Sequence, residues 1–100
     1  MTNLQKNSNL ENHILALLGE ECGELQQAVG KALRFGLHSN MVPILKEFHD
    51  ILAAYKMLTE VLDCSEPMDE NMIEEKIQKV ISFMDPVMVL KLPDAIKPAR

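Results

Sequence analysis

The chain has 100 residues, of which 47% are hydrophobic, with seven Met and no Trp. Its 15 Asp and Glu residues outnumber its 10 Lys and Arg residues, which gives a net charge of −5. This balance excludes a general binder of nucleic-acid polymers, because such a protein needs a basic face. A chain of this length forms one small domain with a modest core. We therefore expect some of the apolar surface to face another copy of the chain.

The sequence also indicates the compartment. It contains no apolar run long enough to span a bilayer and no secretory signal pattern, so we expect a cytoplasmic protein that does not enter a membrane. The two cysteines, Cys22 and Cys64, are too few for a disulfide framework, which agrees with a reducing cytosol. We expect Cys22, in the apolar arc of the first helix, to be a buried thiol.

The first predicted element is a long helix. Residues 1–8 are polar and are expected to form a flexible segment. Ser8 and Glu11 have the spacing of a capping box, which predicts a helix that begins near Asn9. Gly36 is suited to end it. Apolar residues recur between these points at helical spacing: Leu10, Ile14, Leu17, Leu18, Leu25, Ala28, Val29 and Ala32.

The rest of the chain also reads as helical. Pro43 suits the first turn of a second helix. A third helix is expected to begin between Ser65 and Asp69 and to stop before Pro86, followed by a short helix or an extended arm. The apolar stripe of the second helix is predicted to contain Ile44, Phe48, Ile51, Tyr55, Leu58 and Leu62.

These elements define the expected fold. The class is all-α, a helical bundle of three to four helices per chain that assembles into a dimer or a dimer of dimers. We expect one helical domain over residues 9–92, between the flexible segment 1–8 and an irregular tail over residues 93–100.

Four acidic residues fall where a helical wheel predicts apolar contact. Glu21 lies inside the stripe of the first helix and Glu24 lies at its edge. Glu47 lies inside the arc of the second helix, with Asp50 at the rim. Two antiparallel helices joined by a short loop would bring these pairs together, since residues three apart share a face. Carboxylates this close repel one another, and an all-oxygen site suits Mg²⁺ or Mn²⁺.

The alternative is that these residues are ordinary surface acids of helices. The E-x-x-D spacing occurs three times, since Glu60/Asp63 and Glu66/Asp69 repeat it. Among the three pairs, Glu47/Asp50 alone intrudes on an apolar stripe. Geometry alone leaves the metal site and the surface acids both open. The chain has no E-x-x-H motif, which argues against a ferritin-like di-iron site.

The segments "EECGE" and "EFHD" resemble the E-E-x-x-E … E-x-x-D signature of MazG-like nucleoside triphosphate pyrophosphohydrolases, in the all-α NTP pyrophosphatase superfamily. The resemblance covers about residues 14–62. It implies an enzyme that cleaves an NTP or dNTP between the α- and β-phosphates to give NMP and pyrophosphate. It implies Mg²⁺ held by Glu21, Glu24, Glu47 and Asp50. Glu20 matches the first glutamate of the motif and would act near the metal or orient water, so the expected catalytic residues are Glu20, Glu21 and Glu47.

Three further residues are candidates for binding a nucleoside triphosphate. Lys31 and Arg34 follow Glu24 along the same helix and are expected to contact phosphates, although cations are also common near helix C-termini. His13 lies on the Glu24 edge, where it would touch a base or ribose or else remain a solvated surface residue. The competing function is a non-catalytic helical oligomer that acts as a nucleotide- or metal-binding regulatory module.

Overall fold

The structure, a computed structural model, describes residues 6–64 and 68–96. These residues form four α-helices and two short 3₁₀ turns, and no strand occurs among them. The all-α prediction is therefore confirmed for this part of the chain. The chain divides into two compact units, Met1–Glu66 and Pro67–Arg100. The predicted boundaries of a single domain over residues 9–92 stay a prediction.

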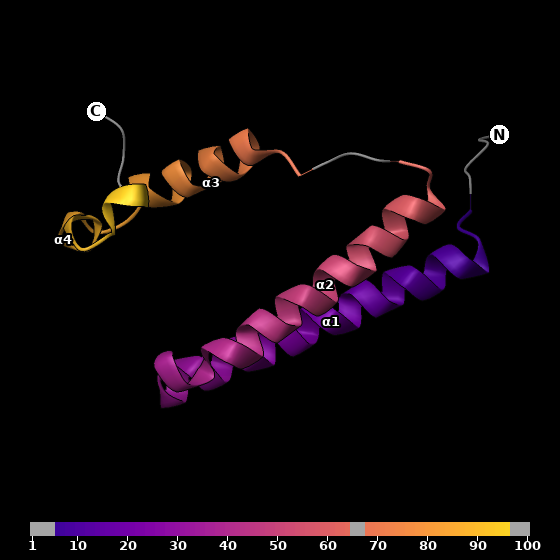
Figure 1. The fold of residues 1–100 in the computed structure, drawn as a ribbon, viewed down its shortest axis with the longest axis horizontal. Helices are drawn as coiled ribbons and strands as arrows, with labels where there is room; N and C mark the ends of the chain where they lie inside the picture. Colours follow the sequence, from indigo (N-terminus) through magenta and orange to yellow (C-terminus); the bar gives the residue numbers. More distant parts are fainter. Residues whose placement is uncertain (1–5, 65–67, 97–100) are drawn as a thin grey trace. The chain divides into compact units, whose positions relative to one another are not determined.

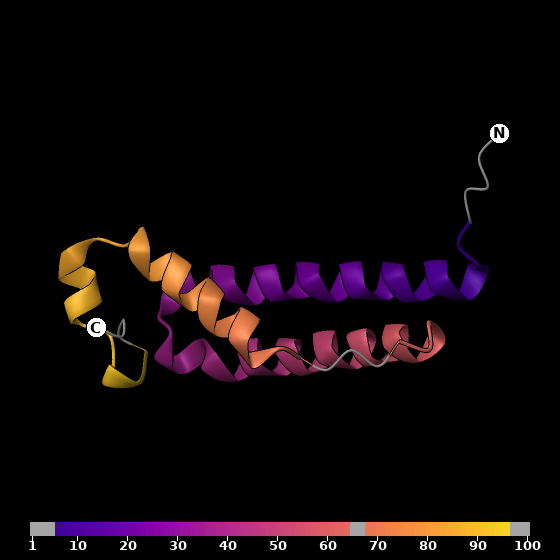
Figure 2. The same cartoon turned by 90° about the horizontal axis from the view of Figure 1, so that it is seen from above.

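The first unit is a helical hairpin. Helix α1 spans Asn9–Phe35 and helix α2 spans Met41–Val61, with the 3₁₀ turn η1 over His38–Asn40 between them. The two helices lie side by side along most of their length and run in opposite directions (Figures 1 and 2). The hairpin supplies the antiparallel arrangement on which the predicted carboxylate cluster depends.

Local side-chain chemistry fixes where α1 begins. Ser8 Oγ accepts a hydrogen bond from the Glu11 backbone N–H, and Glu11 Oε1 accepts one from the Ser8 backbone N–H at 2.7 Å. This reciprocal pair satisfies two donors that the first turn of a helix leaves unpaired. The predicted capping box and helix start are confirmed.

Gly36 ends α1 and sets the turn into α2. Its backbone has φ 103° and ψ 141°, and its N–H donates to the Ala32 carbonyl. The Asn40 side-chain amide donates to the Gly36 carbonyl at 2.8 Å and closes the connection. A residue with a Cβ rarely adopts this backbone conformation.

We predict that Gly36→Ala destabilises the protein by about 1–3 kcal/mol, because alanine must adopt a conformation nearly restricted to glycine. Urea unfolding followed by circular dichroism measures the change. The matched control is Leu37→Ala, since Leu37 is exposed and has an ordinary φ of −70°. The control is expected to change stability by less than about 0.5 kcal/mol. Equal effects of the two substitutions would contradict the prediction.

The remaining helix ends also follow local rules. Asp63 has a left-handed φ of 51°, and the Cys64 N–H donates to the Thr59 carbonyl, which closes α2 with a Schellman-type cap. Helix α3 spans Glu70–Ser82, and its N-cap Asp69 accepts backbone hydrogen bonds from the first turn. The predicted start lay between Ser65 and Asp69, so the helix begins one residue later.

The segment after Pro86 was expected to be either a short helix or an extended arm. Residues 86–90 form a short helix, α4 (Pro86–Leu90), rather than an extended arm. A 3₁₀ turn, η2 (Asp94–Ile96), occupies part of the tail that was expected to be irregular. Residues 1–5 of the expected flexible segment and residues 97–100 of the expected tail lie outside the described residues.

The buried core is small. Ile14 and Ala28 of α1 pack in the hairpin with Ala54 of α2, and Ile81 is buried in the second unit. Leu18, Leu25 and Ala32 of the predicted stripe of α1 are half-buried. Cys22 is exposed in the single chain, so the expectation of a buried thiol was wrong.

Helix α2 carries two apolar faces rather than one. Ile44, Ile51 and Leu58 of the predicted stripe are half-buried with Ala54. Phe48, Tyr55 and Leu62 of the predicted stripe are exposed, so the stripe does not pack against α1 as a single face. They belong to a second line of apolar residues, spaced by three, four or seven positions and ending at the C-cap Leu62, which we call the exposed stripe of α2: Met41, Leu45, Phe48, Leu52, Tyr55 and Leu62.

Candidate metal centre

Four carboxylates meet across the hairpin. Glu21 and Glu24 come from α1, and Glu47 and Asp50 come from α2. One oxygen from each side chain lies within 4.8 Å of the corresponding oxygen of every other member. We call this set the carboxylate cluster. The geometry predicted from the helical wheel, with one acid inside each stripe and one at each rim, brings together the four residues expected.

The cluster is unusual because its charged side chains lie where α1 and α2 meet. Elsewhere along the two helices, small or apolar residues such as Ala28 and Ala54 are buried. Glu21, Glu47 and Asp50 are partly buried, whereas Glu24 is exposed. A charged group in such a place is costly unless it is paired.

Two oxygens of the cluster lack a partner. Glu21 Oε2 and Glu47 Oε2 are buried and accept no hydrogen bond within the described residues. Buried polar atoms are nearly always satisfied, so each such atom needs an explanation. A cation bound between the two helices would supply the missing interaction for both.

The electrostatic repulsion within the cluster also favours a bound cation. Partial burial, followed by the nearby charges of Glu24, Asp50 and Glu47, raises the pKa of Glu21 above 4.5. Both causes disfavour the ionised carboxylate. A positive charge held at the cluster would reverse the effect of the neighbouring acids.

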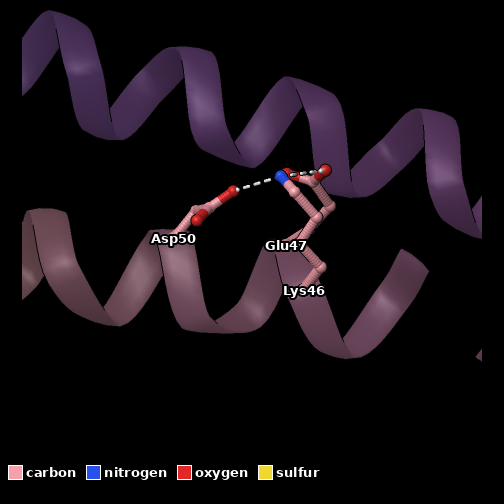
Figure 3. Close-up of polar contacts among 3 residues, drawn as sticks. All are labelled: Lys46, Glu47 and Asp50. Atoms are coloured by element: carbon pink, nitrogen blue, oxygen red, sulfur yellow. Dashed lines mark hydrogen bonds and ion pairs between the residues drawn. The ribbon is translucent and has the colours of Figure 1, made fainter. Parts of the chain in front are cut away.

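One cation is already present at the cluster. Lys46 Nζ donates to Asp50 Oδ2 at 2.9 Å and lies 3.7 Å from Glu47 Oε1 (Figure 3). The hydrogen bond to Asp50 and the charges of Asp50 and Glu47 raise the pKa of Lys46. Lys46 was not among the residues predicted from the sequence, although its i,i+4 spacing to Asp50 is a recognisable signal.

The donor set fits a hard divalent cation. Carboxylate oxygens are the ligands that Mg²⁺ and Mn²⁺ prefer, and the cluster contains no His or Cys. Oxygens around one Mg²⁺ are about 3 Å apart when adjacent and about 4 Å apart when opposite. The four oxygens of the cluster lie within 4.8 Å of one another, which is close to that range.

The other candidate residues lie outside the cluster. Glu20 and His13 are exposed. Lys31 and Arg34 are also exposed and line a groove of about 560 Å³ on α1, together with Gly23, Gly30 and two glutamines. Arg34 additionally lies over the Phe35 ring at 5.8 Å. The structure thus brings the two cations to one groove and leaves their role in phosphate binding a prediction.

The raised pKa of Glu21 predicts a pH-dependent stability. The folded state binds a proton at Glu21 more tightly than the unfolded state, so stability in EDTA should fall as pH rises from 4.5 through the folded pKa. Urea unfolding between pH 4.5 and about pH 7 measures this slope. Glu21→Gln removes the titrating group and should flatten the slope. Saturating Mg²⁺ should oppose the fall, because metal binding favours the ionised carboxylate in the folded state. An identical slope in wild type and in Glu21→Gln would contradict the prediction.

Comparisons with known proteins return no relative. No family model, no curated protein and no solved structure matches the chain. None of the described helices combines the length and the hydropathy needed to cross a membrane. A function can therefore be inferred only from the carboxylate cluster and from the motif resemblance.

Proposed function

We propose that the protein is a Mg²⁺-dependent nucleotide pyrophosphohydrolase that cleaves an NTP or dNTP between its α- and β-phosphates. The observation that carries this proposal is the carboxylate cluster, in which four acids from the E-x-x-E and E-x-x-D segments converge from facing helices. The unpartnered oxygens of Glu21 and Glu47 support a bound cation. The E-E-x-x-E … E-x-x-D resemblance supports the reaction.

The residues present fit the metal that this chemistry requires. Glu21, Glu24, Glu47 and Asp50 would hold Mg²⁺, or Mn²⁺ in its place. When bound, such an ion polarises phosphoryl oxygens, activates water and offsets the charge of the triphosphate. Glu20 lies one residue before Glu21 and, in the proposed enzyme, orients water at the edge of the cluster.

The substrate's phosphates also need cations from the protein. A nucleoside triphosphate is highly negative, and the cluster itself is acidic, so binding requires additional positive charge. Lys31 lies seven residues after Glu24, about 10 Å along α1. Lys31 and Arg34 line the same groove, which supports them as phosphate contacts. His13 is exposed, and we propose that it contacts the base or the ribose of the substrate.

The proposed enzyme works as a homodimer or homotetramer in the cytoplasm. The small core and the exposed stripe of α2 support self-association, because an apolar line of this length is unusual on a monomer surface. On α2 the stripe and Asp50 lie to opposite sides of Ala54, so a subunit packed on the stripe would leave Asp50 accessible. Both described cysteines are free thiols, in keeping with a reducing compartment.

A substrate panel tests the reaction. Purified protein is incubated with each standard NTP and dNTP and with dUTP, in Mg²⁺, Mn²⁺ or EDTA, and the products are resolved by ³¹P NMR. The proposal expects a nucleoside monophosphate with pyrophosphate, and no product in EDTA. Release of a diphosphate with phosphate would contradict the cleavage position. Tight metal binding with no turnover on any substrate would favour the regulatory-module alternative.

A further inference from the structure

The ammonium group of Lys46 occupies part of the carboxylate cluster. Its Nζ lies 2.9 Å from Asp50 Oδ2 and 3.7 Å from Glu47 Oε1, and Figure 3 shows it between these two side chains. Both partners are members of the proposed ligand set. The side chain of Lys46 therefore contacts two of the carboxylates that would ligate a divalent cation.

An ammonium and a divalent cation at the same pair of carboxylates oppose one another electrostatically. A metal bound at about 2 Å from Asp50 and Glu47 would stand within a few ångströms of the Lys46 charge, and the two positive charges would repel. The Lys46 side chain is 68% exposed, whereas that of Glu47 is only 14% exposed. Lys46 can therefore swing into solvent by side-chain rotation, while Glu47 stays in the contact between the helices.

The ordinary role of an exposed i,i+4 pair does not account for this arrangement. Such pairs on helices contribute little to stability, because solvent screens them. Here the lysine faces a cluster of four carboxylates at a helix contact, and repulsion among those acids increases the effect of a single positive charge.

We propose that Lys46 is a tethered counter-ion of the metal-free site, which a divalent cation displaces. It offsets part of the negative charge of the cluster, through Asp50 and Glu47, when no metal is bound, and it competes with the metal for these two carboxylates. Lys46 thereby sets the metal concentration at which the site fills. This inference rests on the metal site of the proposed function but not on the reaction.

The test compares Mg²⁺ binding by isothermal titration calorimetry in wild type, Lys46→Met, Lys46→Arg and Lys56→Met. Lys46→Met should bind Mg²⁺ about threefold to tenfold more tightly and should have a lower melting temperature in EDTA, because the competitor and the counter-ion are both lost. Lys46→Arg keeps the charge and should remain close to wild type. Lys56→Met removes the same charge from an exposed position elsewhere on α2 and should also bind as wild type does.

Displacement has a direct spectroscopic readout as well. In ¹⁵N-labelled protein the Lys46 ammonium signal should be present in EDTA and should shift or disappear at saturating Mg²⁺. Unchanged Mg²⁺ affinity in Lys46→Met, with normal binding by wild type, would overturn this inference and leave the metal site intact. An equal gain in Lys56→Met would overturn it too, since the effect would then be one of general charge. Absence of Mg²⁺ binding in every variant would overturn it together with the metal site.

Discussion

Glu47→Gln is expected to abolish most of the nucleotide hydrolysis while leaving the fold intact. Glu47 is the cluster member with a side chain only 14% exposed, and one of its oxygens is buried without a partner. Glutamine keeps the shape of the side chain but removes the negative charge that a metal requires. Loss of a residue that merely supports a metal ligand costs about 10–100-fold in activity or affinity, so loss of a proposed ligand should cost at least a hundredfold.

The folded state should survive this substitution. Removing one of four mutually repelling charges relieves the cluster, so the melting temperature of Glu47→Gln in EDTA should equal or exceed that of wild type. The matched control is Glu60→Gln, which alters the second E-x-x-D pair of the same helix, outside the cluster. Steady-state hydrolysis and thermal unfolding, measured on both variants, test whether the cluster is required for activity but not for folding. Full activity in Glu47→Gln, or equal losses in both, would show that the cluster is not the catalytic metal site.

The second large effect concerns self-association. Phe48→Glu places a charge in the middle of the exposed stripe of α2, where the Phe48 side chain is 49% exposed in the single chain. Buried aromatic anchors of interfaces contribute 2 kcal/mol or more, so the dissociation constant of the oligomer should rise by at least about 30-fold. Sedimentation velocity over a range of protein concentrations measures the change.

A control on the same helix separates interface loss from added charge. Val42 is 76% exposed and lies off the exposed stripe, so Val42→Glu should leave the oligomer unchanged. Both variants should remain helical by circular dichroism. A wild-type protein that sediments as a monomer at high concentration would contradict the proposed assembly, and an unaffected Phe48→Glu oligomer would exclude this stripe as its interface.

The ends of the helices could be predicted because they depend on neighbouring residues. The reciprocal bonds of Ser8 and Glu11, the positive φ of Gly36 and the cap at Asp69 are local features that short sequence patterns encode. The carboxylate cluster could also be predicted, because the helical wheel places Glu21 and Glu47 inside the apolar stripes of two helices that a short loop makes antiparallel.

The distribution of apolar residues between two faces could not be predicted in the same way. Helix α2 is apolar over a wide arc, and a helical-wheel projection does not determine which part of that arc packs on α1. The structure places Ala54 at the contact and leaves Phe48 and Tyr55 exposed. Cys22 was wrongly expected to be buried for the same reason. Which apolar residues become buried depends on the helices that pack against them, and this tertiary contact is not encoded in the pattern of one helix.

Binding of a divalent cation by the carboxylate cluster underlies the whole proposed function. The decisive experiment is an anomalous-scattering crystal structure in millimolar Mn²⁺. We expect a Mn²⁺ peak coordinated by carboxylate oxygens of Glu21, Glu24, Glu47 and Asp50, with Lys46 turned away from Asp50. A structure with no peak at these four residues and with Lys46 still bonded to Asp50 would contradict the metal site and the function built on it.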